Sequence, residues 1–88
     1  MGSGLTTATF VSALRRMMSE AGEGGATEVL VRASDLHRRV GGYPGQNHRM
    51  PMCCQAMYSE MTASDQVVSA PPKGKGASLT IRFHLPRP

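Results

Sequence analysis

Residues 66–85 read QVVSAPPKGKGASLTIRFHL, and this stretch carries the clearest secondary-structure pattern of the chain. From Ala77 to Leu85 apolar and polar side chains alternate strictly, as in a strand with one buried face. A shorter β-branched run at residues 66–69 precedes it, across a connection rich in Pro, Gly and Lys. The pattern therefore predicts a C-terminal β-hairpin whose basic tip spans residues 71–77.

The chain before the hairpin has helical and strand-like spacings. An apolar stripe of Phe10, Leu14 and Met17 predicts a helix over residues 6–21, capped by a threonine at its start and ended by glycines. A short β-branched run at residues 27–32 predicts a strand.

Two more helices are predicted after this strand. Ser34 is expected to cap a short helix over residues 35–40, which a pair of glycines ends. A Pro-Gly turn at residues 43–47 then leads to a second long helix over residues 48–61.

Together these elements predict one α/β (α+β) domain over residues 6–86, with three helices, a short strand and a C-terminal hairpin. Residues 1–5 are expected to be a disordered N-terminus or a cloning remnant. The strand at 27–32 should pair with the hairpin, because a two-stranded ribbon alone is only marginally stable in water. The side chains expected in the core are Phe10, Leu14, Met17, Leu30, Leu36, Val40, Cys54, Met57, Met61, Leu79, Ile81 and Phe83.

The charge is unevenly distributed along the chain. Ten Lys and Arg against six Asp and Glu give a formal net charge of +4. Residues 1–31 carry two basic and three acidic side chains, whereas residues 32–88 carry eight and three. A basic half on a small domain favours an anionic partner, with nucleic acid ahead of a membrane surface.

Several classes of protein are disfavoured by the sequence. No apolar run is long enough for a transmembrane helix, and no secretory signal is visible. The adjacent Cys53 and Cys54 suit a reducing cytoplasm, and neighbouring cysteines cannot easily ligate one tetrahedral ion together. There is no nucleophile elbow or phosphate-binding loop. We therefore expect a cytoplasmic protein that is not an enzyme and has no metal, cofactor or membrane partner.

The order helix, short strand, helix, turn, helix, hairpin resembles that of the winged helix-turn-helix family of DNA-binding domains. The resemblance spans roughly residues 6–86, although the turn from Gly41 to Asn47 is longer than in the simplest helix-turn-helix proteins. In that family the third helix lies in the major groove, and the hairpin is a wing that touches phosphates or the minor groove. The resemblance implies that residues 48–61 form the recognition helix and that Lys73 and Lys75 tip the wing.

This interpretation assigns side chains to duplex DNA. Those expected to read bases are His48, Arg49, Met52, Gln55 and Ser59, on a helix face that includes the small Ala56. Arginine bonds guanine, and glutamine bonds adenine, through paired hydrogen bonds. Those expected on the phosphate backbone are Arg38, Arg39, Tyr43, Lys73 and Lys75. An ordinary solvated helix face, a solubilising hairpin tip, arginines that only complement a helix dipole, and a Tyr43 that packs on the core are the structural alternatives.

The seven methionines indicate an alternative function, because methionine is over-used on adaptable binding surfaces. The same scaffold would then be a protein-interaction or dimerisation module that docks a partner through the first helix. Methionines also fill small cores that have few aromatic residues. Salt discriminates between the two functions, since DNA binding weakens steeply as salt rises.

Overall fold

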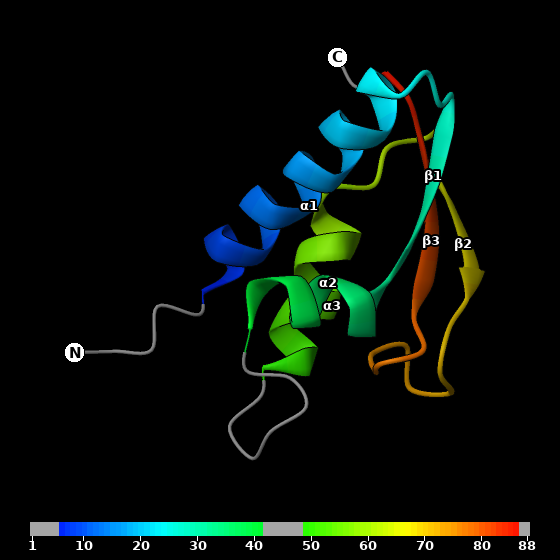
Figure 1. Ribbon diagram of the computed structural model, residues 1–88. Helices are drawn as coiled ribbons and strands as arrows, with labels where there is room; N and C mark the ends of the chain where they lie inside the picture. The colour runs from blue at the N-terminus through cyan, green and yellow to red at the C-terminus, as the bar shows by residue number, and fades with distance from the viewer. Residues whose placement is uncertain (1–5, 42–48, 87–88) are drawn as a thin grey trace.

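The structure, a computed structural model, describes residues 6–41 and 49–86 (Figure 1). Helices α1 (Thr7–Glu23), α2 (Ala33–Val40) and α3 (Met50–Ser59) lie on one side of a three-stranded antiparallel sheet. Strands β1 (Glu28–Arg32), β2 (Gln66–Ser69) and β3 (Thr80–His84) form this sheet in the order β1-β3-β2. The predicted α+β class is confirmed. None of the described helices combines the length and apolar character needed to cross a membrane.

Helix α1 begins as the sequence predicts. The Thr6 side chain accepts from the backbone of Thr9, and the Thr9 side chain accepts from the backbone of Thr6, so that two terminal N–H groups are satisfied. The helix ends at Glu23 rather than Ala21. Gly25, with a φ of +91°, then turns the chain toward β1 in a conformation that favours glycine.

Helix α2 begins at Ala33, and the prediction that Ser34 caps it is wrong. The backbone N–H of Ala33 donates to the carbonyl of Leu79 at 2.8 Å, and that of Ser34 donates to the carbonyl of Ala77 at 3.1 Å. The segment leading into β3 therefore satisfies the first N–H groups of α2, and no side-chain cap is needed.

Helix α3 is shorter than predicted. Arg49 is its N-cap residue, Pro51 lies in its first turn as expected, and the helix ends at Ser59. The backbone N–H of Glu60 donates to the carbonyls of Ala56 and Met57, which closes the last turn.

The predicted pairing of β1 with the hairpin is confirmed, because β3 lies between β1 and β2. Val31 is opposite Ile81 and Val29 is opposite Phe83, so this row faces the helices. Leu30 points to the other face and is 59% exposed. The prediction that Leu30 is a core residue is wrong, because side chains alternate along a strand and the register places its two valine neighbours inside.

The core otherwise follows the predicted pattern closely. The predicted residues found buried are Phe10, Leu14, Leu36, Cys54, Met57, Leu79, Ile81 and Phe83. Met17, Val40 and Met61 are only partly buried against the same cluster. On α1 the buried stripe runs through Phe10, Leu14 and Met18, a constant spacing of four residues, so that Met18 takes the place expected for Met17.

Truncating Leu14, Ile81 or Phe83 to Ala should each lower the free energy of unfolding by about 2–5 kcal/mol, because each leaves a cavity in a fully buried site. Leu30→Ala is the matched control and should change it by less than about 0.5 kcal/mol, since that side chain is largely exposed. Urea unfolding followed by circular dichroism measures all four variants. Equal losses for Leu30→Ala and Ile81→Ala would contradict the register of the sheet.

Candidate nucleic-acid interface

The connection between β2 and β3 is bonded to α3. The Tyr58 hydroxyl donates to the carbonyl of Gly74. The Cys54 thiol donates to the carbonyl of Gly76 and accepts from its N–H, both at 3.3 Å. Gly74 has a φ of +81°, a conformation that side chains rarely adopt. The tip of the hairpin and the third helix therefore form one connected unit.

Lys73 and Lys75 lie on this connection and are exposed. Neither makes an ion pair with any residue in the described ranges 6–41 and 49–86. Figure 1 places the connection at the end of the sheet next to the start of α2. Two cations close to backbone glycines can neutralise phosphates that approach this end of the molecule.

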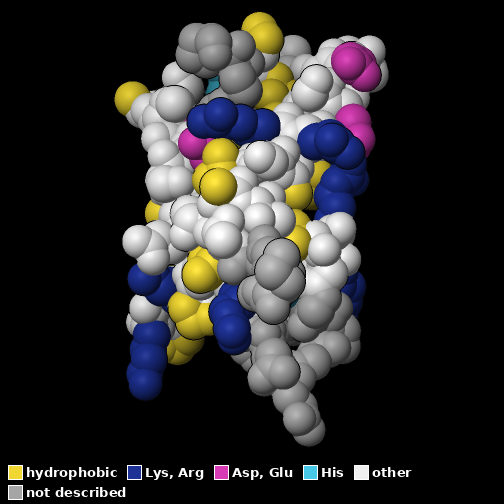
Figure 2. Space-filling view, turned by 90° about the vertical axis from the view of Figure 1, so that its left-hand side faces the viewer, with side chains coloured by type: hydrophobic (Ala, Val, Ile, Leu, Met, Phe, Trp, Pro, Cys, Tyr) yellow, Lys and Arg dark blue, Asp and Glu magenta, His cyan; other side chains and the backbone are white. Residues whose placement is uncertain are grey.

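On one face of the molecule the acidic side chains gather toward one end, whereas basic side chains occur at both. On the face shown in Figure 2, the carboxylate side chains lie in the upper part, whereas the lower part shows basic side chains without them. The lower part corresponds to the end of the molecule at which the β2–β3 connection lies (Figure 1). On this face an anionic partner would meet no carboxylate at that end, although the first turn of α2, which is bonded to the same segment, carries the exposed Asp35.

The exposed stripe of α3 differs from the predicted one. Pro51, Gln55 and Ser59 are exposed, at a spacing of four residues along one face. Met52 is half-buried, and Ala56 is fully buried, so the expectation that Ala56 faces outward is wrong. The bonds to Gly74 and Gly76 turn one side of the helix toward the hairpin, which leaves a narrow stripe centred on Gln55.

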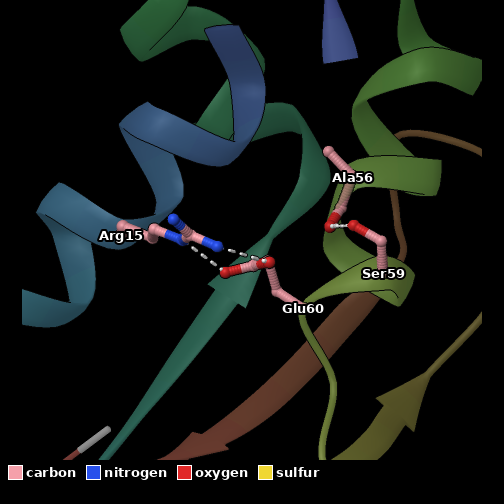
Figure 3. Close-up of polar contacts among 4 residues, drawn as sticks. All are labelled: Arg15, Ala56, Ser59 and Glu60. Carbon is pink, nitrogen blue, oxygen red and sulfur yellow. Dashed lines mark hydrogen bonds and ion pairs between the residues drawn. The ribbon is translucent and has the colours of Figure 1, made fainter. Parts of the chain in front are cut away.

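The other predicted base-reading residues are found at the two ends of α3. Arg49 has an exposed side chain just before the first turn, and its backbone N–H donates to Nε2 of His37 at 2.8 Å. The Ser59 hydroxyl donates to the carbonyl of Ala56 at 2.8 Å (Figure 3), so its oxygen remains able to accept. His48 lies outside the described residues.

The arginines of α2 are engaged by carboxylates. One terminal nitrogen of Arg39 donates to both oxygens of Glu20, at 2.7 and 2.6 Å, and thereby ties α2 to α1. A terminal guanidinium nitrogen of Arg38 lies 3.8 Å from a carboxylate oxygen of Asp35. The two carboxylates partly neutralise Arg38 and Arg39, which were predicted to contact DNA phosphates. Tyr43, the remaining predicted backbone contact, lies outside the described residues.

The two thiols are buried structural groups. Burial, with the neighbouring Cys54 as a smaller cause, raises the pKa of Cys53 to about 12, and burial also raises the pKa of Cys54. Cys53 donates to the carbonyl of Ala33 at 3.5 Å. Within the described part of the chain, no group of three or more His, Cys, Asp or Glu side chains is arranged to hold a metal ion.

A cleft of about 850 Å³ lies between the second half of α1 and the C-terminal end of α3. Its apolar lining includes Met18, Met61 and Leu85. On its wall the Arg15 side chain donates to both oxygens of Glu60 at 2.7 and 3.2 Å (Figure 3), and this carboxylate raises the pKa of Arg15. Sequence reasoning missed this cleft, because tertiary packing brings together residues from distant segments.

Comparison with protein-family models, with curated proteins and with solved structures finds no match. The fold and the candidate interface define a small α+β domain in which a basic hairpin connection is bonded to a helix that has one exposed stripe.

We expect the two thiols to resist alkylation in the folded protein, because the thiolate is the reactive form and a raised pKa keeps each thiol protonated. The raised pKa of Cys53 also makes the stability of the protein depend on pH. The unfolded chain loses its thiol protons near the ordinary value of 9.0, whereas folded Cys53 keeps its proton up to about 12. The free energy of unfolding should therefore fall as the pH rises through this interval.

Iodoacetamide labelling at mildly alkaline pH, with and without urea, measures the reactivity of Cys53 and Cys54 by mass spectrometry. Rapid labelling without urea would contradict the burial of the thiols. Cys53→Ala should flatten the decline of stability with pH.

Proposed function

We propose that this chain is a winged helix-turn-helix domain that binds duplex DNA, with α3 in the major groove and the β2–β3 connection on the phosphate backbone. The order of helices and strands supports this proposal, and so does the pairing of β1 with the hairpin. A helix fits the width of the major groove, and its N-terminal residues normally meet the base edges.

The observation that carries the proposal is the bonding of the hairpin tip to α3. Tyr58 and Cys54 fix Gly74 and Gly76 beside the helix, which sets the spacing between Lys73, Lys75 and the exposed stripe. A fixed spacing between backbone contacts and a reading helix is what a sequence-preferring DNA module requires, because phosphate contacts set the register of base contacts.

Each exposed residue has a separate role in this proposal. Arg49 and Gln55 supply the paired donors and acceptors that discriminate guanine and adenine. Ser59 and half-buried Met52 flank them on α3. Lys73 and Lys75 neutralise phosphates and release counterions, which contributes affinity without sequence preference.

Lys75→Gln should weaken binding to any duplex and lower the slope of log K against log salt by about 0.9, since one phosphate contact is lost. Arg82→Gln is the matched control. It removes one charge from the outer face of the sheet, where Arg82 already contacts Gln66 at 2.5 Å and Glu28 at 4.0 Å. Its slope should equal that of the wild type. Fluorescence anisotropy with random-sequence duplex over a series of salt concentrations measures both.

The substitution pair Lys73→Arg and Lys75→Arg keeps the charge and should keep the slope. If the wild type binds no duplex at low salt, the proposed function is wrong. If Arg82→Gln and Lys75→Gln lower the slope equally, the binding is diffuse and the assignment of the hairpin tip fails.

Arg49→Ala and Gln55→Ala should each relax the preference at one base position and cost about 1–3 kcal/mol on the preferred site. Their effect on random duplex should be small, because base contacts contribute little to non-specific affinity. Sequence selection from a randomised duplex pool, repeated for each variant, measures the change. Unchanged preferences in both variants would show that α3 does not read bases.

A second candidate function, a protein-interaction module, is favoured by the cleft beside α1. Its apolar lining is accompanied by Glu23, which makes no ion pair with other described residues. The last turns of α1 and α3 both border it and contain no basic residue. Helix C-termini attract cations, so the partner this cleft fits is a basic segment with apolar anchors.

A short peptide of alternating leucine and lysine is a suitable probe of the cleft. In this second candidate, backbone amide shifts should change at residues 18–23 and 59–62, and Glu23→Lys should abolish the change. Unperturbed spectra would exclude the cleft as a site for basic segments.

A further inference from the structure

His37 of α2 is a buried polar side chain at the point where the three helices meet. The residue is 0% exposed. Its ring stands edge-on to that of Phe10 in α1, with the centroids 4.9 Å apart. Burying an imidazole is unfavourable unless both ring nitrogens are hydrogen-bonded.

Both ring nitrogens have backbone partners. The N–H of Arg49 donates to Nε2 at 2.8 Å, and Nδ1 lies 3.1 Å from the carbonyl oxygen of Gly41. A nitrogen that accepts a hydrogen bond carries no proton, and a carbonyl can only accept. The two contacts are therefore satisfied by one form of the ring alone, the neutral tautomer with its proton on Nδ1.

The contact to Arg49 has a structural consequence for α3. Arg49 is the N-cap residue of this helix, its side chain makes no cap hydrogen bond, and its carbonyl accepts from the N–H of Cys53. His37 thus bonds the backbone at the point where α3 begins. This bond fixes the start of the helix and the position of the Arg49 backbone, from which the side chain extends.

We propose that His37 is a positioning residue that holds Arg49 and the first turn of α3 in their DNA-binding arrangement only while its ring is neutral, so that acid weakens DNA binding. The inference rests on the proposed function for its effect on DNA, but the state of the ring can be measured without DNA.

Acid would weaken this contact because protonation changes Nε2 of His37 from a hydrogen-bond acceptor into a donor. A second proton on Nε2 would point at the Arg49 N–H, so that two donors would face each other inside the protein. Histidine is the side chain that gains a proton between about pH 8 and pH 5.

Few charged groups of the described residues lie in the turns next to the ring. In the turns next to the ring, α1 has no charged residue between Thr6 and Leu14. The charged or titratable groups of the adjoining turns of α2 and α3 are Asp35, Arg38, Arg39, Arg49 and Cys53. The carboxylate among them is paired with Arg38, and burial keeps the thiol neutral.

The sign of the pH effect makes the inference distinctive. A basic protein ordinarily binds DNA more tightly in acid, because protonated histidines add positive charge that attracts phosphates. Here the affinity should fall instead, as the first turn of α3 loses its anchor. Weakening by acid would therefore not arise from general electrostatics.

The DNA test compares the wild type with His37→Gln by anisotropy on one duplex at about pH 7.5 and about pH 5.5. Glutamine can accept from Arg49 and does not titrate. The wild type should lose affinity in acid, because a protonated ring can no longer accept from the Arg49 N–H. His37→Gln should lose none. His84→Gln, which removes an exposed histidine on β3, is the control and should keep the acid loss.

The second measurement uses the free wild-type protein and does not depend on the variant folding. Long-range ¹H–¹⁵N spectra should show the proton of His37 on Nδ1 at neutral pH, and the Arg49 amide signal should move as the ring gains its second proton. A proton on Nε2 at neutral pH, or an Arg49 amide unaffected by that titration, would overturn the inference.

The DNA-binding measurement and the NMR measurement distinguish a failure of the proposed function from a failure of the inference about His37. Absence of duplex binding at every pH would overturn the proposed function, and with it the effect on DNA, while the spectra would still decide the role of His37 in holding α3. Duplex binding that strengthens in acid, equally in the wild type and in His37→Gln, would overturn the inference and leave the proposed function intact.

Discussion

The segment from Gly74 to Leu85 is bonded to both other strands and to two helices, and the architecture depends on it. Its carbonyls at Gly74 and Gly76 accept from side chains of α3, and those at Ala77 and Leu79 accept from the first backbone N–H groups of α2. Beyond these bonds, β3 runs between β1 and β2. Its inward side chains are fully buried against the helices. A displacement of this segment would therefore break contacts to α2, α3, β1 and β2 together.

This constraint links the core to the candidate interface. The alternation that buries Ile81 and Phe83 fixes the direction in which the chain enters the strand, and the preceding glycines then lie against α3. The lysines of the connection are thereby held beside an exposed helix face rather than on an independent tip. His37 acts in the same way at the other end of α3, because it bonds the backbone where the helix begins.

The parts of this structure that the sequence predicted are those with a strong local period. The strict alternation before Leu85, the apolar stripe through Phe10, Leu14 and Met17, and the Pro-Gly-Lys connection indicated the hairpin, the first helix and the basic tip. These patterns also gave the order of helices and strands and most of the core residues.

The errors occur where apolar residues are adjacent and the period is ambiguous. Val29, Leu30 and Val31 fit either face of a strand, and only pairing with β3 decides which two point inward. Helix α3 has apolar side chains around most of its circumference, so the local pattern does not decide which of them, Ala56 included, are buried by packing against the other elements.

The candidate site was only partly predictable for the same reason. Lys73, Lys75 and Gln55 are exposed as expected, because polar side chains in a turn or on a helix face need no partner to be placed. The engagement of Arg39 by Glu20, the bonding of His37 to Arg49 and the cleft beside Arg15 arise between distant segments. No local pattern signals such contacts.

The most direct test of the central claim is an amide NMR titration of the ¹⁵N-labelled protein with duplex DNA at low salt. If α3 and the hairpin connection form one DNA-binding unit, the largest shift changes will fall together on residues 49–55 and 73–76. The amides that line the cleft beside Arg15 should stay unchanged. Changes confined to that cleft, or to the outer face of the sheet around Leu30 and Arg82, would contradict the account.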